Sequence, residues 1–168
     1  MDEVRIVRAG PERLDDLASL WRSLQEHHRS VDPAIPGIPP RSADDSWPRR
    51  RAKYVDWLRH PDAFVLLAEQ TSSPVGYALV SIHEPADDTH VTGERWAELQ
   101  TLSVEPSRRG SGLGTRLMEQ VYEELRATGI EELAIGVIAT NERAMRFYER
   151  LGFRPWVVTT LGKVPLEK

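Results

Sequence analysis

The chain has 168 residues, and 40% of them are hydrophobic, which is enough for one buried core and short for two. We therefore expect a single domain over residues 1–168. The 26 acidic and 22 basic residues give a formal net charge of −4, so no basic surplus exists to neutralise a nucleic-acid backbone. The lack of cysteine excludes a disulfide framework, a thiolate metal site and a cysteine nucleophile.

The sequence begins without a basic stretch followed by an apolar run, and no run approaches the roughly 20 apolar residues that span a bilayer. We therefore expect a cytoplasmic protein that does not bind membranes. The 19 arginines against three lysines suggest a GC-rich, bacterial genome.

The first third of the chain predicts a strand and two helices. The strand is expected over residues 4–8, and Pro11 can open a helix after it. Prolines are dense from residue 31 to 48, which predicts a loop, and a second helix is expected over 49–59. Apolar residues of the first helix recur with the spacing of one buried face, at Leu14, Leu17, Leu20, Trp21 and Leu24.

The middle of the chain predicts a hairpin and a crossover. Two β-rich runs, 63–69 and 75–83, are separated by a short turn and indicate antiparallel strands. A strand over 95–104, a helix over 111–128 and a strand over 133–138 then form a βαβ unit, whose two strands should be parallel.

The last elements are a helix over 141–151, stopped by Gly152, and a strand over 153–160. Together the elements predict an α/β domain with a mixed, mostly antiparallel sheet of six or seven strands, flanked by helices. We find no internal repeat.

A glycine-rich turn, Arg109-Gly110-Ser111-Gly112-Leu113-Gly114, joins the predicted strand 95–104 to a helix. Glycines let the backbone approach an anion, and the helix N-terminus adds partial positive charge. The dinucleotide fingerprint would need glycine at Thr115, and the nucleotide P-loop would need a lysine after its last glycine. A phosphate cradle of another kind and a plain helix entrance both fit the spacing.

This turn resembles the Arg/Gln-x-x-Gly-x-Gly/Ala turn of the GNAT superfamily of N-acetyltransferases. Downstream, the run from Asn141 to Phe153 is similar to the family segment Asn-x-x-Ala-x-x-Phe-Tyr-x-x-x-Gly-Phe. The order of elements resembles the family over nearly the whole chain, and residues 30–47 depart most from it. The resemblance implies an acetyl-CoA-dependent N-acetyltransferase whose sheet splits near Val104 to receive CoA.

The resemblance also implies which residues bind CoA. Backbone groups of residues 102–104 would hold the pantetheine arm, the turn would hold the pyrophosphate, and Asn141 would both cap its helix and contact the arm. The implied cofactor-binding residues are Leu102, Ser103, Val104, Arg109, Gly110, Ser111, Gly112, Leu113, Gly114, Thr115, Asn141 and Tyr148.

Tyr148 and Glu98 are the catalytic candidates. In the family the tyrosine matching Tyr148 protonates the departing thiolate, and a phenol keeps its proton at neutral pH. An alkylamine is almost fully charged at that pH, so Glu98 or solvent must accept a proton before attack. Alternation along the strand predicts that Glu98 and Leu102 lie on one side. A core tyrosine and a solvent-facing glutamate are the alternatives.

The histidines and an acidic loop give weaker indications of metal binding and of the acceptor. The five histidines have no zinc-binding spacing, so we expect no metal. An acidic loop, with Glu84, Asp87, Asp88 and Glu94, would attract a cationic amine, either a small molecule or a peptide. Family members often dimerise, which makes a homodimer an expectation. The competing function is a non-catalytic acyl-CoA sensor.

Overall fold

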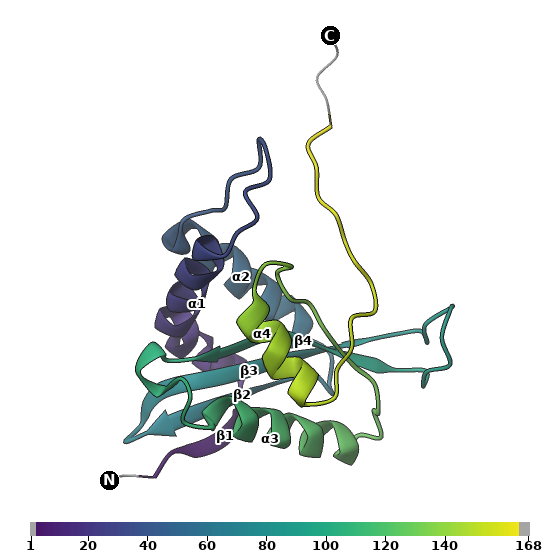
Figure 1. Ribbon diagram of the computed structural model, residues 1–168. Coiled ribbons are helices and arrows are strands. Elements are labelled where there is room, and N and C mark those ends of the chain that lie inside the picture. The colour runs from purple at the N-terminus through teal and green to yellow at the C-terminus, as the bar shows by residue number, and fades with distance from the viewer. Residues whose placement is uncertain (1–2, 165–168) are drawn as a thin grey trace.

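The computed structural model describes residues 3–164 and is built on a sheet with strand order β1-β2-β3-β4-β5 (Figure 1). Neighbouring strands from β1 to β4 are antiparallel, whereas β4 and β5 are parallel, which confirms the predicted crossover. The strands are β1 (Arg5–Ala9), β2 (Phe64–Gln70), β3 (Ser73–His83), β4 (Trp96–Val104) and β5 (Leu133–Ile135).

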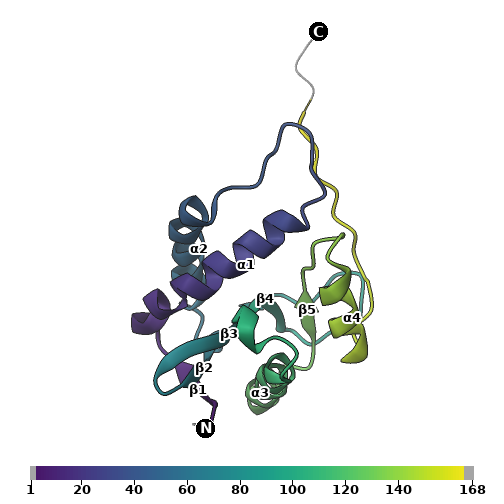
Figure 2. The same cartoon turned by 60° about the vertical axis from the view of Figure 1, so that its left-hand side comes forward.

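Helices cover both faces of the sheet (Figure 2). One face carries α1 and α2, and the other carries α3, while α4 lies beside β5. A 3-10 helix, Pro11–Leu17, leads into α1, so a helix opens at Pro11 as predicted and becomes α-helical at Ala18. The helices are α1 (Ala18–Ser30), α2 (Ala43–Trp57), α3 (Leu113–Ala127) and α4 (Glu142–Arg150).

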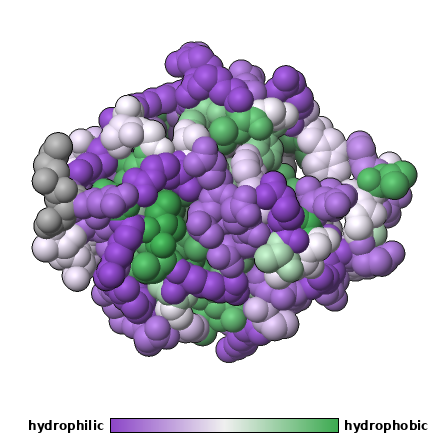
Figure 3. Space-filling view, turned by 90° about the horizontal axis from the view of Figure 1, so that it is seen from below, coloured by the Kyte–Doolittle hydropathy of each residue, from purple (hydrophilic) through white to green (hydrophobic). Residues whose placement is uncertain are grey.

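Each face of the sheet has its own hydrophobic core. Under α3, side chains from β2, β3 and β4 pack against Leu117, Met118 and Val121. Under α1 and α2 the core is aromatic and includes Trp21 and Tyr54. Seen from below, the surface of the molecule is mainly hydrophilic, and its hydrophobic residues form separate patches (Figure 3). Within residues 3–164, no helix is long and apolar enough to cross a membrane.

The expected six or seven strands were wrong for the described part of the chain, which forms five. The strand predicted over 133–138 stops at Ile135, and residues 153–160 are extended without a paired partner strand. Valine and threonine favour strands, but a strand also needs a neighbour to accept its hydrogen bonds.

The helix predicted over 49–59 begins six residues earlier, at Ala43. The Ser42 hydroxyl accepts a hydrogen bond from the Asp45 N–H at 3.1 Å, and Asp44 adds negative charge to the first turn. Pro48 therefore lies inside the helix, where it removes one donor without ending it. We predicted that the loop ends at Pro48, but the Ser42 cap starts the helix before that proline.

A β-bulge interrupts the alternation of β4. Leu79 of β3 faces Thr101, but the next residue, Val80, faces Leu99, so Gln100 is an extra residue on β4. Leu99 and Leu102 consequently both pack into the core under α3. Glu98 therefore lies on the other face, and the prediction that it shares a side with Leu102 was wrong.

Candidate active site

The two parallel strands, β4 and β5, separate from one another at one side of the sheet. β4 and β5 pair only from Ala97 with Leu133 to Leu99 with Ile135, and the rest of β4 continues without β5 beside it. This separation leaves one edge of β4 open beyond Leu99. An open strand edge presents backbone N–H and C=O groups that an extended ligand can bind.

A cavity of about 370 Å³ lies beside the open part of β4. Its walls come from β4, the glycine-rich turn, α3 and α4, with Leu24 and His27 of α1 closing one end. Nine of the twelve residues predicted to bind the cofactor line it, namely Leu102, Val104, Arg109, Gly110, Gly112, Gly114, Thr115, Asn141 and Tyr148.

The three other predicted residues do not line the cavity. The Ser103 hydroxyl points to α1 and donates to the Leu20 carbonyl at 3.1 Å. Ser111 is exposed and donates to the Arg108 carbonyl at 2.6 Å, while Leu113 is buried in the core under α3. The side chains of these three residues therefore do not face the cavity, and only their backbone groups could bind the cofactor.

The glycine-rich turn places the start of α3 at the cavity. Gly110 and Gly112 have φ angles of 79° and 84°, which residues with a Cβ atom rarely adopt. Gly112 is the N-cap of α3, and no side chain caps the helix there. The first N–H groups of α3 are thus free of a side-chain acceptor and can bind an anion in the cavity.

Arginines dominate the charge of the cavity wall. Arg108, Arg109, Arg143 and Arg150 line it, and none of its described lining residues is acidic. Burial and then the nearby Arg143 lower the pKa of Arg109, and no carboxylate stands among the described residues that line the cavity. This arrangement suits a ligand with several phosphate charges.

Asn141 and His27 meet at the end of the cavity near α1. Asn141 is the N-cap of α4, as predicted, and its Oδ1 accepts from the Ala144 N–H at 3.2 Å. Its side chain also hydrogen-bonds His27. Burial, followed by the charge of Arg109, lowers the pKa of His27, so the imidazole is neutral at pH 7.

Tyr148 and its neighbour Phe147 both border the cavity and both contact the core under α3. The two adjacent rings meet edge to face, with 5.1 Å between their centroids. Burial and then the nearby Tyr122 raise the pKa of Tyr148. The phenol therefore keeps its proton throughout the neutral range and can donate it.

Glu98 lies outside this cavity, in a polar cluster where β4 begins to separate from β5. Its Oε2 is 3.1 Å from Nε2 of His83, and that nitrogen is 3.0 Å from the Ser81 hydroxyl. The Ser81 Oγ accepts from Gln100 at 2.9 Å. The His83 ring stacks on Trp96 with 4.4 Å between centroids, which fixes its orientation.

Several residues of the cavity and of the polar cluster around Glu98 were not predicted from the sequence. Arg143 stands at a variable position of the motif Asn-x-x-Ala, so the motif places it near Asn141 without assigning it a role. His27 and His83 have no local signal, because they come from α1 and β3 and meet the site only through tertiary packing. Within residues 3–164, no group of three or more His, Asp or Glu side chains is arranged to hold a metal ion.

Solved structures share this fold. A GCN5-related N-acetyltransferase from Ralstonia eutropha JMP134 matches with a TM-score of 0.73 at 18% identity, over 98% of this chain and 99% of that one. A predicted acetyltransferase with acetyl-CoA from Clostridium acetobutylicum matches with a TM-score of 0.72 at 16% identity, over 94% and 96% of the two chains.

Sequence comparison identifies relatives and a family. A mycothiol acetyltransferase from Thermobispora bispora is 32% identical over 112 residues, which are 67% of this chain and 36% of that protein. The chain thus spans about a third of the length of this relative. The model of the acetyltransferase (GNAT) family matches residues 21–153, which include the separated strands, the glycine-rich turn and α4. This chain belongs to the GNAT family of acetyltransferases.

Proposed function

We propose that the chain transfers an acetyl group from acetyl-CoA directly to an amine. The observation that carries the proposal is the position of the cavity, which joins an anion-binding turn to the open edge of β4. The turn and the arginines would bind the pyrophosphate, and the open edge would bind the pantetheine arm as an added strand. Such binding directs the thioester toward the point where β4 and β5 separate.

The acceptor amine would lose its proton to Glu98, either directly or through water. An alkylamine with a pKa near 10.4 is about three units from neutral at pH 7.4, which costs roughly 4 kcal/mol. Nε2 of His83 lies 3.1 Å from the Glu98 carboxylate, and the His83 ring is stacked on Trp96, so this contact would orient the carboxylate. This arrangement of a base held by a third group is common in transfer enzymes.

The neutral amine then forms a bond to the thioester carbon, and the carbon–sulfur bond breaks. Backbone N–H groups at the open edge of β4 would stabilise the oxyanion. Tyr148 would donate its hydroxyl proton toward the leaving sulfur. No covalent enzyme intermediate forms, which agrees with the lack of cysteine.

The acceptor would be a cationic amine. Glu84, Asp88 and Glu94 are exposed in the loop between β3 and β4, which leads into the strand that carries Glu98. The Asp87 carboxylate stabilises the loop instead, because it accepts hydrogen bonds from the backbone N–H groups of Thr89 and His90. The three exposed carboxylates would draw an ammonium group toward the separated strands.

The test is release of CoA thiol from acetyl-CoA across a panel of amines. The panel includes amino acids, peptides, aminoglycosides and amine precursors of mycothiol, the last because a mycothiol acetyltransferase is a relative. Release that depends on an amine, with a mass increase of one acetyl group on it, supports the proposal. Saturable binding of acetyl-CoA without release for any amine would favour the acyl-CoA sensor instead.

A further inference from the structure

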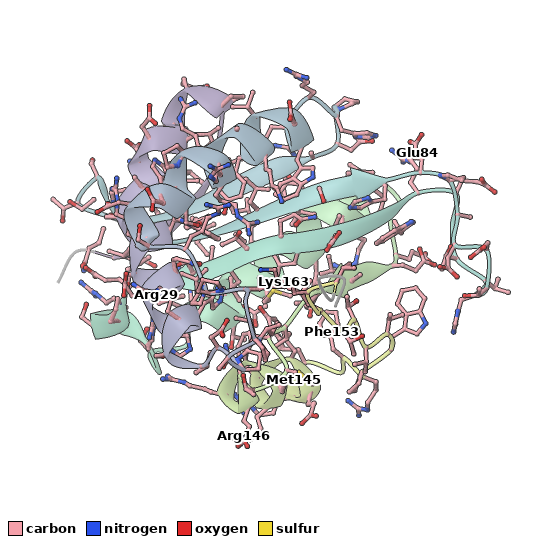
Figure 4. The ribbon with its side chains drawn as sticks, turned by 90° about the horizontal axis from the view of Figure 1, so that it is seen from above. Arg29, Glu84, Met145, Arg146, Phe153 and Lys163 are labelled. Carbon is pink, nitrogen blue, oxygen red and sulfur yellow. The ribbon has the colours of Figure 1, made fainter. Side chains whose placement is uncertain are left out.

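The last turn of α1 closes one end of the cavity beside β4. His27, which is half-buried, comes from this turn and lines the cavity. Figure 4 labels Arg29 in the same turn and Met145 on α4, and Figures 2 and 4 both show the end of α1 close to the start of α4. The Thr140 hydroxyl donates to the Val31 carbonyl and ties the two elements together. His27 is therefore held at a wall that a ligand of the cavity would touch.

The groups around His27 belong to three elements and are mainly positive. Burial first, and then the charges of Arg109 in the glycine-rich turn and Arg143 on α4, lower the pKa of His27. On α1 itself, the ring of His28 lies 6.4 Å away between centroids and is uncharged at neutral pH, because burial lowers its pKa to about 4. The hydrogen bond with Asn141 and the C-terminal end of the α1 dipole act in the opposite direction and favour a charged ring.

This environment makes the imidazole sensitive to a bound anion. Arg109 and Arg143 disfavour a proton on the ring as long as no negative charge offsets theirs, and none of the described residues that line the cavity is acidic. A pyrophosphate is ionised at neutral pH, and a negative charge within about 6 Å of a titratable group favours its protonated form. A phosphate held beside Arg109 would therefore reverse the effect of the cavity on His27.

We propose that His27 binds the pyrophosphate of acetyl-CoA together with Arg109, and that the imidazole takes up a proton from solvent as the cofactor binds. The protonated ring donates one N–H to a phosphate oxygen and keeps its hydrogen bond with Asn141 through the other nitrogen. The inference rests on the proposed binding of acetyl-CoA. It adds a residue of α1 that belongs neither to the glycine-rich turn nor to the segment 141–153.

The direction of the pH dependence follows from the two states of the ring. In the protein without ligand the pKa of His27 lies below 6.5, so the ring is mostly neutral at pH 6.5. In the complex the phosphate raises this pKa, so a larger fraction of the rings carries a proton. Binding thus consumes a fraction of one proton per site, and the affinity rises as the pH falls.

Calorimetric titration in two buffers of different ionisation enthalpy measures the proton count. The probe is acetyl-dephospho-CoA, which keeps the pyrophosphate but lacks the 3′-phosphate, a group that itself titrates at about pH 6. At pH 6.5 the wild type should take up a fraction of one proton per site, and His27→Gln should lose this uptake. From pH 8 to pH 6 the affinity of the wild type relative to this variant should rise about threefold to tenfold.

Two further variants separate the titration of His27 from damage to the fold. His28→Gln changes the next residue of α1, which does not line the cavity, and should keep the uptake. Arg143→Ala removes one of the charges that oppose protonation, so the ring should already hold more protons before binding and the uptake at pH 6.5 should fall. Cooperative thermal unfolding shows that each variant is folded.

The outcomes separate this inference from the proposed function. Equal proton counts for the wild type and His27→Gln, or an affinity ratio that does not change with pH, would overturn the role of His27 and leave acetyl-CoA binding intact. Failure of the folded wild type to bind either acetyl-CoA or acetyl-dephospho-CoA would overturn both.

Discussion

Leu99 and Leu102 lie three residues apart on β4, yet both side chains pack into the core under α3. In a regular strand, residues an odd number apart face opposite sides of the sheet. The extra residue at Gln100 removes the conflict and turns Glu98 toward the face that carries α1 and α2. The bulge therefore places Glu98 across the sheet from Leu102, beside His83 at the point where the strands separate.

Replacing Glu98 by Gln should lower kcat/KM about tenfold to a hundredfold at pH 7.5, because the charged amine then loses its proton only to solvent. The deficit should shrink as the pH approaches about 10, where the amine is increasingly neutral. Initial rates from pH 7 to 10 measure both effects. Glu119→Gln, an exposed change on α3, is the matched control. A deficit that is constant with pH would contradict a role as base.

His83 should act through Glu98 and not on the substrate. His83→Asn removes the contact with Glu98 and the stacking on Trp96, so kcat/KM should fall, but by less than the Glu98→Gln change lowers it. In the background Glu98→Gln the same change should have little further effect, since coupled residues are not additive. Additive losses in the double variant would show that His83 acts independently of Glu98.

Tyr148→Phe should reduce kcat about a hundredfold or more, since it removes the hydroxyl that we propose protonates the leaving sulfur. Affinity for acetyl-CoA, measured by calorimetry, should stay within about twofold because the ring remains. Tyr122→Phe removes a hydroxyl from a neighbouring tyrosine outside the cavity and should leave turnover unchanged. Equal turnover by the Tyr148 variant would remove this residue from the mechanism.

Arg109→Ala should weaken acetyl-CoA binding about tenfold through loss of a charge-assisted contact. Acetyl-pantetheine lacks the pyrophosphate, so its turnover should respond little to the same change. Arg126→Ala, at the exposed far end of α3, serves as the control. Equal losses with both acyl donors would place Arg109 away from the phosphates.

His28 predicts a loss of stability in acid. Burial, followed by the charges of His27 and Arg50, lowers the pKa of His28 from 6.5 to about 4. Below pH 6.5 the unfolded chain binds a proton that the folded chain does not, so stability falls as the pH drops toward 4. From pH 7.5 to 5 this amounts to about 2 kcal/mol by linkage. Urea unfolding should show a smaller loss for His28→Gln, whereas exposed His90→Gln should behave as wild type.

The sequence predicted those features that depend on local signals. The glycines of the turn, the Asn141 cap and the parallel crossover follow from residue type and spacing, and the structure contains all three. The bulge at Gln100 has no such signal, since it results from fitting β4 to both cores and to β3. His83 and His27 join the site from distant elements, which no spacing along the chain reveals. The segment 153–160 carries strand-forming residues, but its pairing depends on a neighbour.

Calorimetric titration of the wild-type chain with acetyl-CoA tests the central claim most directly. The account predicts one saturable site per chain, with a Kd in the micromolar to millimolar range usual for enzyme substrates, and weaker binding by acetyl-pantetheine. Absence of binding at millimolar acetyl-CoA, in a preparation that unfolds cooperatively, would contradict the assignment of the cavity beside β4.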